Sequence, residues 1–199
     1  MARTKDDALH KQRQQQILHA AKHCFVENGF HQSSMRQILK QSGISAGAAY
    51  NYFSSKSEIV KGLVEEELAD VNYLENKLHS AKNPLIGIAQ MIYTIIRHTK
   101  YEDAVLASEI HAESCRNPEI AKVTARINKK LESLINDAIV EGREQGCITT
   151  KHKSKELTDW VIALYEGYVG KIAVDKKFKH KVNAKVAERA VLVFLAFEP

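Results

Sequence analysis

The chain has 199 residues, of which 44% are hydrophobic, so it is long and apolar enough to bury a sizeable core. The longest apolar run, Leu85 to Ile96, is interrupted by polar residues and glycine and falls short of the roughly 18 residues that a membrane span requires. The polar N-terminus has no apolar export signal, and the three cysteines form no C-x-x-C pair. We therefore expect a cytoplasmic protein with reduced thiols.

The formal net charge of +5 is concentrated at the start of the chain. Residues 1–57 hold eight Lys and Arg against three Asp and Glu, whereas residues 58–199 hold 21 of each. A basic segment on a neutral body indicates a polyanion partner for that segment, because Lys and Arg release counterions from a phosphate backbone. On charge alone, a solvated basic face explains the count equally well.

The spacing of apolar residues predicts an all-α fold, since they recur every three or four positions and no segment alternates with a period of two. The first helix is expected over 11–28, where Gly29 supplies a left-handed cap. A capping box of Ser34 and Gln37 opens a second, short helix that stops at Gly43.

Two more helix starts follow closely. Ser45 is placed to cap a third short helix over 46–53, and Ser55 with Glu58 forms a second capping box that opens a fourth. The fourth helix carries a one-sided apolar stripe from Val60 to Leu78, which is typical of a connector between two domains.

Five further helices are expected, at 84–99, 103–115, 118–145, 154–174 and 183–197. Pro84 suits the first position of its helix, because the N–H that proline lacks would be unpaired there. That helix is apolar on most sides and should run through the middle of the second domain.

The last two helices carry more small and apolar residues than one buried stripe requires. Ala163, Gly167 and Gly170 recur at helical spacing and would let another helix approach closely. A second copy of the chain covering this extra face explains the pattern, so we expect a homodimer through 154–174 and 183–197. The alternative is that both helices are fully buried within one protomer.

The two short helices joined by the tight turn at 42–45 form a candidate helix-turn-helix over 34–53. Residues 46–49, Ala-Gly-Ala-Ala, leave the leading edge of the third helix nearly bare, so its backbone can approach base pairs closely. Residues 50–52, Tyr-Asn-Tyr, then offer polar groups suited to phosphates and base edges. A glycine turn between short helices is weak evidence by itself.

A specific combination of motifs strengthens this interpretation. It consists of Ala20-Ala21 followed by Phe25, Gly29-Phe30, Ser34-Met35-Arg36-Gln37-Ile38, Gly43-Ile44-Ser45-Ala46-Gly47-Ala48-Ala49-Tyr50-Asn51-Tyr52-Phe53 and Ser55-Lys56-Ser57-Glu58. This combination resembles the TetR family of transcriptional regulators. The resemblance implies a helix-turn-helix DNA-binding domain over 11–71 and a ligand-binding and dimerisation domain over 84–199, with about nine helices in all.

What the resemblance implies for function is a homodimeric repressor on a palindromic operator of double-stranded DNA. The implied DNA-binding residues are Ser34, Arg36, Ser45, Ala46, Gly47, Ala48, Tyr50, Asn51, Tyr52 and Lys56. Two positions depart from the family pattern, because Ala49 stands where a larger apolar residue is usual and Leu39 where alanine is usual. The bare edge of the third helix also shifts specificity toward Tyr50, Asn51, Arg36 and DNA shape.

The resemblance further implies a small-molecule effector that binds among the fifth to eighth helices and releases the protein from DNA. We hypothesise that the effector acts by shifting the fourth helix, because the continuous stripe from Val60 to Leu78 could transmit a rigid tilt. The expected pocket residues are Met91, Ile92, Ile95, His111, Cys115, Trp160, Leu164 and Tyr165. Methionine and aromatic residues at helical spacing are also ordinary core, so this assignment has a structural alternative.

Catalysis and metal binding find little support in the sequence. His19, His23 and Cys24, and separately His111 and Cys115, have metal-ligand spacing but lack a further ligand nearby in the sequence. No nucleophile elbow or Gly-rich phosphate loop is present. We expect no enzyme activity, cofactor or metal; the competing classes are a helical scaffold that has lost DNA binding and an enzyme on an all-α frame.

Overall fold

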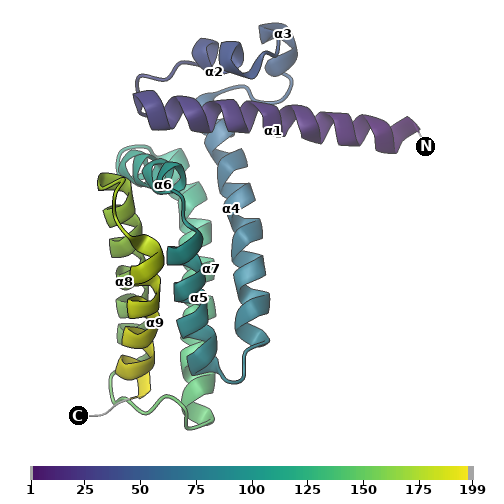
Figure 1. Cartoon of the computed structure of the whole chain (residues 1–199). Coiled ribbons are helices and arrows are strands. Elements are labelled where there is room, and N and C mark those ends of the chain that lie inside the picture. Colours follow the sequence, from purple (N-terminus) through teal and green to yellow (C-terminus); the bar gives the residue numbers. More distant parts are fainter. Residues whose placement is uncertain (1, 197–199) are drawn as a thin grey trace. The chain divides into compact units, whose positions relative to one another are not determined.

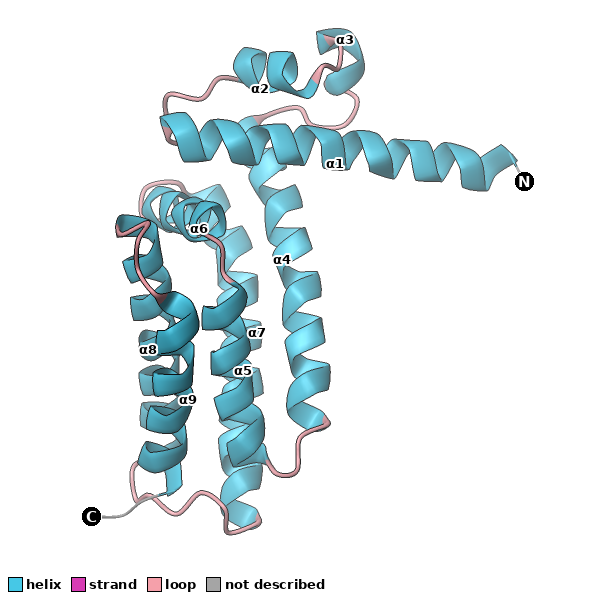
Figure 2. Ribbon diagram, in the orientation of Figure 1, coloured by secondary structure: helices cyan, strands magenta, loops and turns pink. Residues whose placement is uncertain are grey.

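The computed structural model describes residues 2–196, and side chains from residue 7 onward. Within this range the chain forms helices and loops without strands, which confirms the all-α prediction (Figures 1 and 2). The helices are α1 (Ala2–Asn28), α2 (Met35–Ser42), α3 (Ala46–Ala49), α4 (Lys56–His79), α5 (Pro84–His98), α6 (Tyr101–Ser114), α7 (Pro118–Glu144), α8 (Ser154–Val174) and α9 (His180–Ala196). Phe197, expected in the last helix, lies outside the described residues. None of the described helices combines the length and apolarity needed to span a bilayer.

The residues form two compact units, and neither unit is contiguous in sequence. The first consists of the residues up to Glu66 together with Leu106–Thr124, and the second of Glu67–Val105 together with the residues from Ala125 onward. Helices α4, α6 and α7 therefore each contribute to both units. The contiguous functional domains expected from sequence remain a prediction.

The capping box predicted before α2 is present in full. The Ser34 Oγ accepts a hydrogen bond from the Gln37 backbone N–H at 3.2 Å, and the Gln37 Oε1 accepts one from the Ser34 N–H at 2.7 Å. Two backbone donors that a helix start leaves unpaired are thus satisfied reciprocally.

Helices α1 and α3 differ from their predicted bounds. Helix α1 begins at Ala2 rather than at residue 11, because the first ten residues contain no Pro or Gly that would stop a helix. Helix α3 ends at Ala49 rather than Phe53, since the Tyr52 N–H donates to the Ala49 carbonyl in a tighter, three-residue turn. This turn returns Phe53 to the core, where it is 6% exposed.

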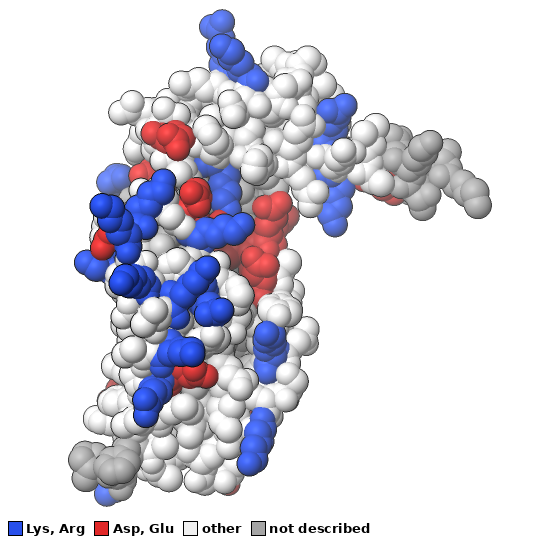
Figure 3. Space-filling model, in the orientation of Figure 1, with Lys and Arg blue, Asp and Glu red and all other residues white. Residues whose placement is uncertain are grey.

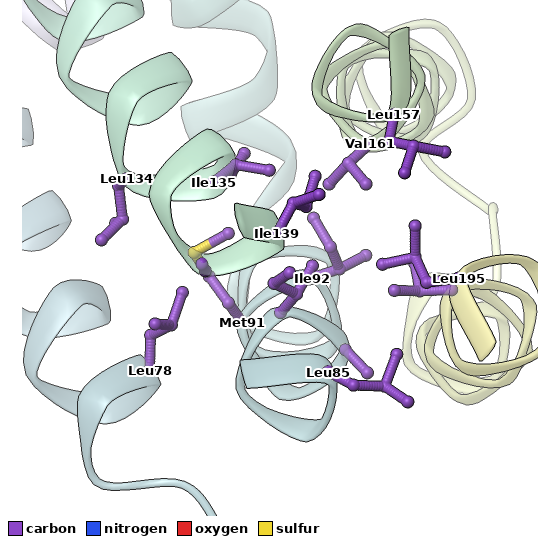
Figure 4. Close-up of a cluster of buried hydrophobic side chains, with 14 of the residues drawn as sticks. Leu78, Leu85, Met91, Ile92, Leu134, Ile135, Ile139, Leu157, Val161 and Leu195 are labelled. Atoms are coloured by element: carbon purple, nitrogen blue, oxygen red, sulfur yellow. The ribbon is translucent and has the colours of Figure 1, made fainter. Parts of the chain in front are cut away.

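The core of the second unit is built around α5, which packs against α9 along its length. Pro84 fills the first turn, as the sequence predicts, and the Asn83 Oδ1 caps the helix by accepting the Ile86 N–H at 2.9 Å. In Figure 4, Ile92 and Leu85 of α5 lie among side chains contributed by α7, α8 and α9. A continuous apolar core thus joins five helices, α4, α5, α7, α8 and α9.

The contribution of the cap before α2 can be measured directly. Replacing Ser34 by alanine removes the side-chain acceptor, so we expect the free energy of unfolding to fall by about 1 kcal/mol. Urea denaturation followed by circular dichroism measures the change. Ser54→Ala, which alters an exposed serine outside any helix, is the matched control and should have little effect. Equal stability of the two variants would contradict the role of the cap.

Candidate nucleic-acid interface

The turn between α2 and α3 is fixed by three local constraints. Gly43 adopts a left-handed conformation with φ 68°, which a residue with a side chain rarely accepts. The Ser42 Oγ donates to the Leu39 carbonyl at 2.9 Å and accepts the Ile44 N–H at 3.2 Å. The Gln16 Nε2 of α1 donates to the Ser42 carbonyl at 2.7 Å, so a hydrogen bond ties the turn to α1.

Helix α3 exposes its small residues and buries one. Ala46, Gly47 and Ala48 are exposed, whereas Ala49 is fully buried and anchors the helix. A Cβ added at Gly47 would meet nothing within 4 Å. The predicted bare edge therefore lies on the surface, and another molecule can come close to the backbone there.

The polar residues after α3 are exposed to solvent to different degrees. Tyr50 is 52% exposed and Asn51 is also exposed, so their polar groups are open to a partner. Tyr52 is half-buried, with its ring centroid 4.7 Å from that of His10 on α1. The N-terminal part of α1, which the sequence did not predict as helix, thus braces one of the predicted DNA-binding side chains.

Three of the predicted DNA-binding residues lie at the starts of α2 and α3. Ser34 and Arg36 of α2 are exposed, although the Ser34 hydroxyl is already engaged in the capping box. Ser45 is exposed and makes no side-chain cap hydrogen bond to α3, contrary to the capping expected from sequence. Its hydroxyl is accordingly not used to stabilise the helix that it precedes.

Lys56, predicted to contact phosphate, is engaged within the protein. Its half-buried Nζ donates to the Phe30 carbonyl at 2.7 Å and lies 4.4 Å from the centroid of the Phe30 ring. Burial lowers the pKa of this ammonium group, and the nearby charge of Glu113 acts in the opposite direction. Lys56 therefore holds the loop that follows α1.

Two carboxylates of α6 hold the same loop, and no local pattern in the sequence points to them. The Glu109 Oε2 accepts the Phe30 N–H at 2.7 Å. Glu113 is 5% exposed, and its Oε2 lies 2.8 Å from the His31 Nε2. Because these contacts cross more than 75 positions of sequence, only the folded chain brings the groups together.

The surface so formed has a counterpart in known proteins. Residues 17–63, which contain the turn and α3, match the sequence model of bacterial regulatory proteins of the tetR family. This stretch therefore has the sequence of the DNA-binding domain found in TetR-family transcriptional regulators. It is 28% identical over 138 residues to the HTH-type transcriptional regulator UidR of Escherichia coli strain K12, which is 67% of each protein. It is 21% identical over 164 residues to the HTH-type transcriptional repressor DhaR of Mycobacterium sp. strain GP1, covering 81% of this chain and 83% of DhaR.

Solved structures share the fold of most of this chain. The transcriptional regulator FadR from Bacillus subtilis, solved in complex with stearoyl-CoA, superimposes with a TM-score of 0.79 at 21% identity. The match covers 89% of this chain and 97% of FadR. At this identity the likeness establishes the fold, with its helix-turn-helix and helical second part.

The eight predicted pocket residues do not come together in one pocket. Met91 and Ile92 are fully buried in the core of the second unit, and four half-buried residues pack against it, namely Ile95, Trp160, Leu164 and Tyr165. His111 and Cys115 are exposed and belong to the first unit. Trp160 stacks on Phe194 with 4.1 Å between ring centroids, a contact within the core. Burial raises the pKa of the Tyr165 phenol.

A hollow in the surface of the second unit lies elsewhere. It is a groove of about 530 Å³ between α4 and α7, with walls of mixed charge that include Glu75, Arg126 and Lys130. Lys130 pairs across the groove with Glu75 at 3.1 Å. None of the eight predicted pocket residues lines it.

The cysteines and histidines do not assemble a metal site in the part of the chain that the structure describes. Cys24 is buried, which raises the pKa of its thiol, whereas Cys115 is exposed. The spacing of His19, His23 and Cys24 on α1 is therefore not accompanied by converging ligands.

The hydrogen bond from Phe30 to α6 is open to a specific test. Glu109→Ala removes a charged acceptor from a half-buried N–H, so we expect the free energy of unfolding to fall by about 1–2 kcal/mol. Amide hydrogen exchange at Phe30 should become faster, which locates the effect. Glu102→Ala, an exposed position on the same helix, is the control. Unchanged exchange at Phe30 would show that this bond does not hold the loop.

Proposed function

We propose that this protein is a ligand-responsive repressor of the TetR family, which binds a palindromic operator as a homodimer and is released by a small-molecule effector. The observation that carries the proposal is the exposed, nearly bare α3 followed directly by the exposed Tyr50 and Asn51. Such an element has no evident use in the core, and its size and polar end suit the major groove. A regulator of this kind acts in the cytoplasm, where it meets DNA.

In this proposal, α3 enters the major groove and the surrounding polar groups hold the backbone. Tyr50, Asn51 and Arg36 read base edges, since asparagine can pair bidentately with adenine and arginine with guanine. The small residues Ala46, Gly47 and Ala48 permit close approach of the helix. Ser34, Ser45, Tyr52 and Lys56 are proposed at or near phosphates. For Lys56 this requires one of its remaining N–H donors, because another serves the Phe30 carbonyl.

The proposed homodimer is supported by exposed apolar residues on α8 and α9. Val174, Val182, Val186 and Val193 are between 56% and 80% exposed, which is unusual for so many valines in neighbouring helices. A Cβ added at Gly167 or Gly170 would meet nothing within 4 Å, so these glycines are not required by packing within the protomer. A second copy that packs α8 and α9 against their equivalents would cover this face.

The symmetry of the proposed dimer determines the symmetry of the operator. Two recognition helices related by a twofold axis read the same bases in opposite directions, so the operator is a palindrome with half-sites about one helical turn apart, or a multiple of it. We propose repression as the default, because a dimer occupying a promoter excludes other proteins. The relation to DhaR, described as a repressor, supports this choice.

The effector is proposed to enter the helical second part of the chain. The similar fold of FadR, solved with stearoyl-CoA, supports a regulator that responds to a small molecule. We place the site among α5 and α8, at Met91, Ile92, Ile95, Trp160, Leu164 and Tyr165. Because Met91 and Ile92 are closed off from solvent, a ligand has to separate these helices. Helix α4 continues into both compact units and is the proposed route to the DNA-binding domain.

The recognition surface is tested by a matched pair of tyrosine variants. Tyr50→Ala should weaken binding by about 5- to 150-fold, because removing one good base-edge or phosphate interaction costs on the order of 1–3 kcal/mol and about 1.4 kcal/mol is a factor of ten. The probe is a duplex enriched from a random pool by the wild-type protein, in a gel-shift assay. Tyr73→Ala on α4 removes a ring of similar exposure, 55% against 52%, and should bind as the wild type does. Full affinity of Tyr50→Ala would refute the proposed placement of α3.

The dimer is tested by a charge placed on the proposed interface. Val186→Asp on α9 should convert the dimer to monomer, because a carboxylate would be buried there without a partner. Val140→Asp on α7, where the valine is 40% exposed, introduces the same charge away from the interface and should leave the dimer intact. Sedimentation velocity distinguishes the two states. A dimeric Val186→Asp variant with native circular dichroism would exclude this interface.

A further inference from the structure

The segment that links α8 to α9 is strongly basic. Residues 171–185 contain six lysines and one aspartate, a net charge of +5 that equals the charge of the entire chain. The balanced count over 58–199 conceals this segment, since acidic residues elsewhere offset it. The regulator therefore has two basic regions, and only the first is explained by the helix-turn-helix.

All six lysines are exposed. Figure 3 shows many Lys and Arg side chains on the face of the molecule that carries α8 and α9. The six lysines are Lys171, Lys176, Lys177, Lys179, Lys181 and Lys185. None of their ammonium groups pairs with a carboxylate among the residues that the structure describes. The Lys176 Nζ instead lies 5.1 Å from the centroid of the Tyr101 ring. The charge of the segment is thus uncompensated at the surface.

The positions of these lysines do not favour the helix that they begin. Lys181 lies in the first turn of α9, which has no acidic residue, and cations at this end of a helix oppose its dipole. Lys181 and Lys185 are four residues apart on the same face and repel each other. Because local stability does not account for the arrangement, a partner of opposite charge is the better explanation.

The shape of the surface selects the class of partner. A small anion needs a concave site, and none of the six lysines lines the groove between α4 and α7 or the hollow beside Glu109 and Glu113. Segments that lie on membranes present Trp, Phe or Leu, whereas the large apolar residues exposed here are Val174 and Val182, which the proposed dimer covers. An extended polyanion, by contrast, needs neither a concave site nor large exposed apolar residues.

We propose that the lysines of residues 176–181, which lie between the dimer faces proposed for 154–174 and 183–197, form a second DNA-binding surface, which contacts duplex phosphates without reading their sequence. The proposal rests on the DNA binding proposed for α3, because the same partner is used. Each protomer of the dimer would add such contacts to those of its helix-turn-helix. Their effect is to strengthen binding to any duplex at low salt, since lysine–phosphate contacts release counterions.

Two triple variants that remove equal charge test the proposal. One carries Lys177→Gln, Lys179→Gln and Lys181→Gln; the other carries Lys82→Gln, Lys100→Gln and Lys129→Gln, at exposed positions elsewhere in the second unit. The probe is a random-sequence duplex of about 40 base pairs, titrated between about 50 and 200 mM NaCl, where counterion release dominates. The slope of log affinity against log salt should become shallower by about 0.9 for each phosphate that the protein no longer neutralises, in the first variant only. Equal slopes for the two variants would overturn the proposal.

A chemical footprint tests the lysine surface independently of the DNA binding proposed for α3. Acetylation of the full-length protein, followed by mass spectrometry, should show that the random duplex protects Lys177, Lys179 and Lys181 but not Lys82, Lys100 and Lys129. If Tyr50→Ala kept full affinity while these three lysines were still protected, the placement of α3 would fail and this surface would stand. Protection by vesicles of anionic phospholipid and not by the duplex would assign the segment to a membrane and overturn the proposal.

Discussion

The Gln16 side chain, donating at 2.7 Å to the Ser42 carbonyl, fixes the turn on which the recognition surface depends. Gly43 lets the chain reverse direction, but a reversal alone leaves the next helix free to swing. The bond from α1 removes that freedom, and burial of Ala49 then fixes the rotation of α3 about its axis. The exposure of Gly47 and Tyr50 is a consequence of these contacts, so a surface of three small residues can be well defined without large side chains of its own.

Much of the fold follows from local chemistry that a sequence displays. Three local features mark helix ends to within a residue or two: the capping box of Ser34 and Gln37, the left-handed Gly43, and Pro84. The first two provide partners for backbone groups at a helix end, and Pro84 lacks an N–H that would be unpaired there. The start of α1 and the end of α3 were predicted less well, each for its own reason. Phe53 leaves the helical path to be buried, whereas the start of α1 has no apolar pattern to reveal it.

The candidate site could be predicted where its residues are adjacent in sequence and not where they are distant. The exposed residues from Ala46 to Asn51 lie on one short segment. Small residues followed by polar ones in this segment predict an element on the surface. The engagement of Lys56 with Phe30 depends on a loop 26 residues away, and spacing gives no hint of it. Apolar periodicity equally cannot separate a pocket from a core, which is why Met91 and Ile92 suit either assignment. The lysines of 171–185 were hidden for another reason, since charge was averaged over too long a segment.

The contacts of Glu109 and Glu113 with the loop after α1 affect when the first unit can fold during synthesis. The DNA-binding motif ends near residue 58, yet the unit that contains it includes Leu106–Thr124. During synthesis the loop at Phe30 has no acceptor from α6 until more than a hundred residues have been made. A nascent chain therefore completes this unit late, and a fragment cut after α4 would lack two of the carboxylates that hold it. Grafting the recognition motif onto another protein would accordingly require a substitute for this piece of α6.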